Sequence, residues 1–204
     1  MIVYKYLMKK DLLDFKINGT IYLNTLCNLR SEKEPIRDEL EGIRRLAVST
    51  GNEISSCTEE ASKKGQFILL LPNVYMQVAD AFVFCTSLKL DDRLGKKWGY
   101  DSYYKITDPM QFAETVYWNL NKYVSLRGFM IGKVKYRSKD GFIETKDKNR
   151  VLQNYPINYW DFCFTKPEKF SYEKEFRMVF VLEHTKEIKP LLLTCLELEK
   201  SCKC

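Results

Sequence analysis

Histidine is almost absent from this chain of 204 residues, and its single copy, His184, excludes whole classes of site. A zinc site built from several histidines is ruled out, and a hydrolytic triad would have to use His184 as its base. Glycine-rich phosphate loops are missing too, so P-loop and dinucleotide-fingerprint binding lack their usual sequence support. No apolar run approaches the length of a bilayer-spanning helix, so we expect no membrane association.

Paired cysteines are also lacking, because the seven cysteines include no Cys-x-x-Cys motif. We expect no signal peptide before them, and Cys85 and Cys163 lie in apolar runs that are typical of buried free thiols. We therefore expect a reducing, cytoplasmic compartment. The Cys202-Lys203-Cys204 tail supplies two thiols, which is too few for a structural zinc site, and we predict no bound metal.

The composition is that of an ordinary globular domain, with 45% hydrophobic and 29% charged residues. The length suits a single domain over residues 1–204. Lysine and arginine exceed aspartate and glutamate by 33 to 27, a net charge of +6, but the two signs are interspersed along the chain. This balance gives a weak preference for anionic partners, although a solvated surface kept soluble by its net charge is the better explanation.

Hydrophobic periodicity predicts an α+β fold. Residues 2–6 and 20–23 read as strands on either side of a helix over 11–17, which Asn18-Gly19 ends. Asp108-Pro109 opens a second helix, and Phe176–Leu182 is the clearest strand in the sequence.

We expect a mixed, mostly antiparallel sheet (or sheets) of about six to eight strands with two to four flanking helices. Residues 28–65 are polar with weak periodicity, and they indicate a long loop or a loosely held helical excursion.

Charged residues gather where the clearest strand begins. Period-2 geometry places Glu175 and Arg177 on one face, together with Glu173 if the strand already runs at residue 173, and that face becomes apolar further along. Acidic and basic groups at the mouth of a buried strand mark a candidate cleft. A cross-strand ion-pair cluster with no function explains the same pattern, and the sequence does not separate the two interpretations.

Two other segments supply groups that would suit the same cleft. Thr86 and Ser87 place two hydroxyls at the end of an apolar strand, where they would otherwise serve as strand-end caps. Tyr4 and Tyr6 share one face of the first strand, with Lys5 on the other face. Core and rim packing is the ordinary role of such tyrosines.

These segments, taken in order, resemble an uncharacterised family of bacterial proteins associated with defence. The matching parts are the following: Tyr4-Lys5-Tyr6, the helix that ends at Asn18-Gly19, Thr20-Ile21-Tyr22-Leu23, Arg37-Asp38-Glu39-Leu40-Glu41-Gly42, Phe84-Cys85-Thr86-Ser87 and Glu173-Lys174-Glu175-Phe176-Arg177. The Arg37–Gly42 segment is similar to a degenerate form of the family's Asn-Asp-Pro-x-Glu motif. The resemblance covers most of the chain and implies a bacterial toxin or a phage-defence effector.

The same order of parts is similar to the ADP-ribosyltransferase fold, and this resemblance implies NAD as a substrate. It makes Glu175 the catalytic carboxylate, which would stabilise the cation that develops on the ribose. It makes Glu173 the residue that engages the acceptor, and it assigns Ser87, with Thr86, to the orientation of Glu175. Tyr4, Tyr6, Thr86 and Arg177 would contact the cofactor, and a protein or nucleic acid would be the acceptor.

Two alternatives remain open. The first is a non-enzymatic module of a defence system that binds nucleic acid or protein through interleaved basic and aromatic residues. These residues are Lys96, Lys97, Trp98, Tyr100, Tyr103 and Tyr104. The second is a metal-dependent nuclease that uses Asp38, Glu39 and Glu41, although a solvated acidic turn explains these residues more simply.

Overall fold

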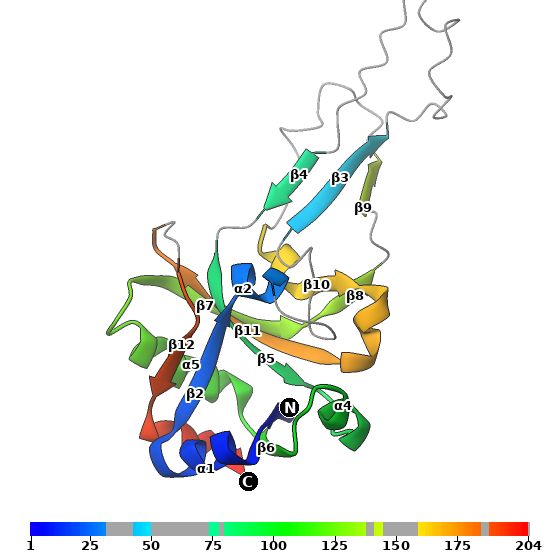
Figure 1. Ribbon diagram of the computed structural model, residues 1–204. Helices are drawn as coiled ribbons and strands as arrows, with labels where there is room; N and C mark the ends of the chain where they lie inside the picture. The colour runs from blue at the N-terminus through cyan, green and yellow to red at the C-terminus, as the bar shows by residue number, and fades with distance from the viewer. Residues whose placement is uncertain are drawn as a thin grey trace, which may run out of the picture.

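The structure is a computed structural model that describes residues 1–31, 43–49, 74–77, 80–137, 141–144, 159–184 and 188–203. Helices and strands mix along the chain, which confirms the predicted α+β class with mostly antiparallel pairing (Figure 1). The elements, in chain order, are β1 (Val3–Leu7), α1 (Lys9–Asn18), β2 (Thr20–Thr25), α2 (Leu26–Ser31), β3 (Ile43–Ser49), β4 (Val74–Gln77), β5 (Ala81–Ser87), α4 (Asp92–Lys97), β6 (Ser102–Ile106), α5 (Pro109–Leu120), β7 (Leu126–Lys133), β8 (Lys135–Arg137), β9 (Gly141–Glu144), the 3-10 helix η1 (Tyr159–Phe164), β10 (Thr165–Pro167), the 3-10 helix η2 (Glu168–Glu173), β11 (Glu175–Leu182), β12 (Leu191–Thr194), the 3-10 helix η3 (Leu196–Ser201) and β13 (Cys202–Lys203).

One sheet of eight strands forms the body of the molecule. Its main path runs β12-β2-β5-β1-β6-β13, and β11 pairs with both β5 and β7. The eight strands agree with the predicted number. Two small sheets accompany it: β10 pairs with β8, and β3 lies between β4 and β9. The three-stranded sheet projects away from the main sheet in Figure 1.

The centre of the main sheet is buried on both faces, because β11 alternates between two hydrophobic clusters. Phe176, Met178 and Phe180 belong to the larger cluster, which also contains the apolar side of α5. Val179 and Val181 belong to a smaller cluster, which α2 covers. A strand that is buried on both sides reads as a continuous apolar run, which is why β11 was the clearest strand in the sequence.

Local signals explain where the two predicted helices lie. Asp108 caps α5, because its carboxylate accepts hydrogen bonds from the backbone N–H groups of Met110 and Gln111. Helix α1 ends at Gly19, whose φ of 66° is left-handed. A Cβ at Gly19 would lie 2.0 Å from the carbonyl oxygen of Cys195, so only glycine fits where the helix meets β12 and its following turn.

The two edges of β5 have different partners, and this difference makes room for the candidate site. Strand β11 pairs with β5 along its whole length, from Glu175 opposite Ser87 to Val181 opposite Ala81. The other edge serves two strands, because β2 pairs at Phe82 and Val83 whereas β1 pairs only at Ser87. Strands β1 and β2 therefore diverge and leave β5 open around Cys85.

Several predictions fall on residues that the structure does not describe. Within the predicted excursion over 28–65, residues 32–42 and 50–65 lie outside the described ranges, and so do Asp38, Glu39 and Glu41. Residues 43–49 form strand β3 rather than the long loop or loosely held helical excursion that we expected, because β3 gains partners on both edges. In the part of the chain that is described, no helix is long and apolar enough to cross a membrane.

Candidate functional site

The two glutamates lie on either side of a tight backbone turn. Glu173 ends η2 and Glu175 begins β11, and the intervening Lys174 has a left-handed conformation with φ 46° and ψ 47°. This conformation is uncommon for a residue that carries a Cβ. Lys174 is held there because its carbonyl accepts a hydrogen bond of 2.8 Å from the N–H of Leu88. The turn directs both carboxylates toward the same basic group.

That basic group is Lys166, on β10. Its Nζ donates to Glu173 Oε2 over 2.7 Å and to Glu175 Oε2 over 3.0 Å. Arg177 completes the network, because its Nε lies 2.6 Å from Glu175 Oε1. Their exposed fractions are 6% for Lys166, 2% for Glu173, 5% for Glu175 and 0% for Arg177. The predicted charged cluster is therefore a buried network of four ionisable groups rather than a surface cluster.

The two carboxylates differ in pKa because their surroundings differ. Burial favours the neutral form of Glu175, but Arg177 and Lys166 outweigh it and hold the pKa of Glu175 well below its ordinary value. Burial raises the pKa of Glu173 to about 7, against the opposing ammonium of Lys166. Glu175 is therefore a permanent anion at neutral pH, whereas Glu173 exchanges a proton near neutrality.

A pocket opens over this network, with an empty volume of about 580 Å³ including open solvent. It lies where β1 and β2 diverge from β5, and it has an aromatic wall and a charged wall. The aromatic residues are Tyr4, Tyr6, Trp98 and Tyr100, and the ionisable ones are Lys5, Lys166, Glu173, Glu175 and Arg177.

The structure therefore brings most of the predicted site residues together. Six of the seven line this one pocket: Tyr4, Tyr6, Thr86, Glu173, Glu175 and Arg177. The Arg177 guanidinium is engaged by protein groups, because it pairs with the Glu175 carboxylate and its Nη1 also donates to the carbonyl oxygen of Cys163 over 2.6 Å. The seventh residue, Ser87, does not line the pocket but lies opposite both Tyr4 and Glu175 in the sheet.

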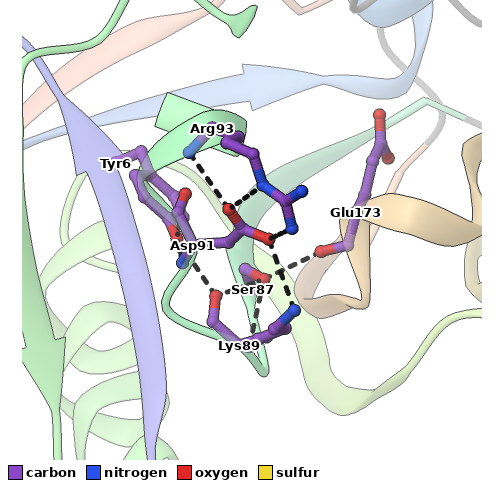
Figure 2. A network of polar contacts seen from close by, with 6 residues as sticks. All are labelled: Tyr6, Ser87, Lys89, Asp91, Arg93 and Glu173. Atoms are coloured by element: carbon purple, nitrogen blue, oxygen red, sulfur yellow. Dashed lines mark hydrogen bonds and ion pairs between the residues drawn. The ribbon is translucent and has the colours of Figure 1, made fainter. Parts of the chain in front are cut away.

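The two hydroxyls of β5 bind backbone groups instead of carboxylates. Thr86 Oγ1 donates to the carbonyl oxygen of Phe176 over 2.8 Å. Ser87 Oγ lies 2.8 Å from the carbonyl oxygen of Glu173 and 2.9 Å from that of Lys89. In Figure 2 the Glu173 backbone faces Ser87 while its carboxylate points away. Ser87 thus orients the turn that carries the glutamates rather than the Glu175 carboxylate itself.

The tyrosines of β1 have different roles. The hydroxyl of Tyr6 accepts a hydrogen bond of 2.6 Å from the N–H of Asp91 and lies within reach of the Lys89 and Asp91 carbonyls, as Figure 2 shows. It fastens the start of α4, and its ring packs against Trp98 at 5.7 Å between centroids. The hydroxyl of Tyr4 makes no hydrogen bond to the described residues, and its ring is the freer of the two to contact a ligand.

Lys5 is an ammonium group at the open edge of β5. Its Nζ donates to the carbonyl oxygen of Cys85 over 3.0 Å and lies 4.5 Å from the centre of the Phe84 ring. Lys5 forms no ion pair with any described residue. Burial lowers its pKa, although the charge of Glu175 opposes this change. A cation without a carboxylate partner in a pocket suits an anionic ligand.

Sequence reasoning missed Lys166, because nothing in the sequence indicates that its ammonium reaches the glutamates seven and nine residues later. Trp98 is notable because its indole Nε1 is buried without a hydrogen-bond partner among the described residues. A buried donor of this kind is uncommon.

The basic and aromatic stretch after β5 is divided by the fold. Trp98 and Tyr100 line the pocket, whereas Tyr104 is buried and stacks on Phe15 at 4.1 Å between ring centroids. Lys97 lies 3.6 Å from the centre of the Tyr172 ring. Only part of the predicted surface is thus available to a macromolecule.

The other candidate groups that fall within the described residues form no metal site. His184 is exposed after β11, and the described residues contain no group of His, Cys, Asp and Glu side chains that could hold a metal ion. Comparison of the chain with protein-family models, curated proteins and solved structures finds no match. The two family resemblances drawn from the sequence therefore remain predictions, and a function is inferred from the residues of the pocket.

Proposed function

We propose that this chain is an NAD-dependent ADP-ribosyltransferase-like protein. The observation that carries the proposal is one pocket in which an aromatic wall faces a buried pair of glutamates with separated pKa values. An aromatic wall can stack against the planar rings of a ligand, and a fixed carboxylate can stabilise a positive charge that develops on a ribose. NAD combines both features with a negatively charged pyrophosphate.

Each charged residue has a role in this proposal. Glu175, kept ionised by Arg177 and Lys166, stabilises the positive charge on the ribose as the bond to nicotinamide breaks and nicotinamide leaves with the electron pair. Glu173 accepts the proton that the acceptor nucleophile loses when it bonds to the ribose carbon. Lys5, which lacks an ion-pair partner among the described residues, suits a phosphate of the same molecule.

The biological setting follows from the sequence resemblance alone. We propose a cytoplasmic toxin or phage-defence effector whose acceptor is a protein or a nucleic acid. A second function keeps the same setting without chemistry, as a module that binds nucleic acid or protein. It is favoured by the exposed lysines Lys96 and Lys97 at the end of α4, where Lys96 lines a hollow together with the exposed Tyr103. Oligonucleotide binding that weakens steeply with salt would support this alternative.

The test is incubation of the full chain with labelled NAD, with and without cell extract. We expect label to be transferred to a macromolecule, and nicotinamide to be released. Glu175→Gln should abolish turnover while circular dichroism shows a folded protein. Glu168→Gln is the matched control, because Glu168 is an exposed carboxylate on η2. Equal turnover by wild type and Glu175→Gln would overturn the proposal, as would an inert wild-type protein.

A further inference from the structure

Lys166 stands out among the buried ionisable groups, because it contacts both glutamates and was not singled out by the sequence. Lys166 comes from β10, and the chain folds back through η2 so that the two glutamates that follow reach its ammonium group. The ammonium also lies 4.6 Å from the centre of the Phe170 ring. Lys166 is thus enclosed between one aromatic face and two carboxylates.

The contacts of the two glutamates are unequal. Glu175 is paired with Arg177 through Nε at 2.6 Å and Nη2 at 3.3 Å, in addition to Lys166. Among the described residues, Lys166 is the one cation in ion-pair contact with Glu173. Removing Lys166 would therefore leave Glu175 with a partner and Glu173 without one.

The backbone around Glu173 is fixed independently of Lys166. Ser87 holds its carbonyl group, and the left-handed turn at Lys174 sets its direction. Only the orientation and the charge of the side chain remain to be determined, and Lys166 contacts that end. Other titratable groups that interact with the pair come from β1, β5, β8 and β11, namely Lys5, Cys85, Tyr136 and Arg177.

We propose that Lys166 is a positioning residue, which aims the Glu173 carboxylate into the pocket and makes Glu173 the group that takes up the acceptor's proton. The inference rests on the proposed function for its chemical meaning, but the link between Lys166 and Glu173 can be measured without NAD. Two carboxylates so close together in a buried site favour keeping a proton on one of them. The shared ammonium opposes this tendency and allows Glu173 to release its proton.

The experiment is a carbon-13 NMR titration of glutamate carboxyls in the full chain, with Glu173 assigned by Glu173→Gln. In Lys166→Met we expect the Glu173 midpoint to rise by at least about one pH unit, because burial and Glu175 are then less opposed. Lys166→Arg, which keeps the charge, should restore most of the wild-type midpoint. Lys169→Met is the matched control, because exposed Lys169 contacts the same Phe170 ring at 4.7 Å.

Turnover supplies the second readout. The acidic limb of the pH–rate profile should move upward by the same amount in Lys166→Met and stay in place in Lys169→Met. If Lys166→Met does not fold, Lys166→Gln takes its place. An unchanged Glu173 midpoint in the neutral variant would overturn the role of Lys166. A shifted midpoint in a protein that never consumes NAD would instead overturn the proposed reaction and Glu173 as its base.

Discussion

The side chain of Ser87 lies 2.8 Å from the carbonyl oxygen of Glu173, so the end of one sheet strand holds the turn that begins the next. The two residues are 86 positions apart in sequence. Leu88 repeats the link through its N–H, which donates to the carbonyl oxygen of Lys174 over 2.8 Å. These two bonds fix the glutamates relative to β5 independently of any ligand.

Removal of the Ser87 hydroxyl should therefore affect stability as well as the site. We expect Ser87→Ala to lower the free energy of unfolding by about 1–2 kcal/mol, because a buried carbonyl loses a donor. Urea denaturation measures this loss. Ser125→Ala is the control, because Ser125 is exposed and its side chain makes no hydrogen bond to the described residues. Equal stability of the two variants would contradict the structural role of Ser87.

The two tyrosines of β1 should respond differently to loss of their hydroxyls. Tyr6→Phe removes the acceptor for the Asp91 N–H, and we expect a loss of about 1–2 kcal/mol in thermal or chemical unfolding. Tyr4→Phe should change the unfolding free energy by less than about 0.5 kcal/mol, because no described residue is bonded to that hydroxyl. The reverse order of effects would show that the start of α4 is held in another way.

The left-handed residue between the glutamates is expected to be strained. Glycine adopts this conformation freely, so Lys174→Gly should raise the free energy of unfolding by up to about 1 kcal/mol. Lys174→Val should lower it, because a β-branched side chain fits this conformation least well. Differential scanning calorimetry on both variants provides the comparison. A less stable glycine variant would argue against strain at this position.

The raised pKa of Glu173 predicts a dependence of stability on pH. The folded state holds the Glu173 proton up to about pH 7, whereas the unfolded chain releases it near the ordinary value of 4.5. Between these values the folded state binds more protons, so its stability falls as pH rises. We expect the unfolding free energy to drop by roughly 1–3 kcal/mol from pH 5 to 7, and Glu173→Gln to remove this slope.

The pattern of side chains along strands was readable from the sequence because it depends on local geometry. Glu175 and Arg177 share a face of β11, and Tyr4 and Tyr6 share a face of β1, as period 2 requires. The caps of α1 and α5 follow from Gly19 and Asp108 for the same reason. The class of fold followed from these elements.

The partners of those side chains were not readable, because they depend on which segments meet in space. Nothing near Lys166 in the sequence indicates that its ammonium reaches two glutamates, and nothing near Ser87 indicates a bond to the Glu173 backbone. We expected the Ser87 hydroxyl to contact the Glu175 carboxylate. The two residues do lie opposite each other in the sheet, but the hydroxyl bonds to the backbone carbonyl of Glu173 instead. Long-range hydrogen bonds of this kind require the sheet order, which the sequence pattern did not provide.

The open edge of β5 has a consequence for how the protein would report a bound molecule. Strands β1 and β11 lie along opposite edges of β5, and β1 pairs with β5 at a single position. A molecule that contacts both Tyr4 and Glu175 would therefore link β1 to β11 and hold the first strand in place. Its arrival would slow the exchange of amide hydrogens in the first strand, and the same signal would identify a ligand whose chemistry is unknown.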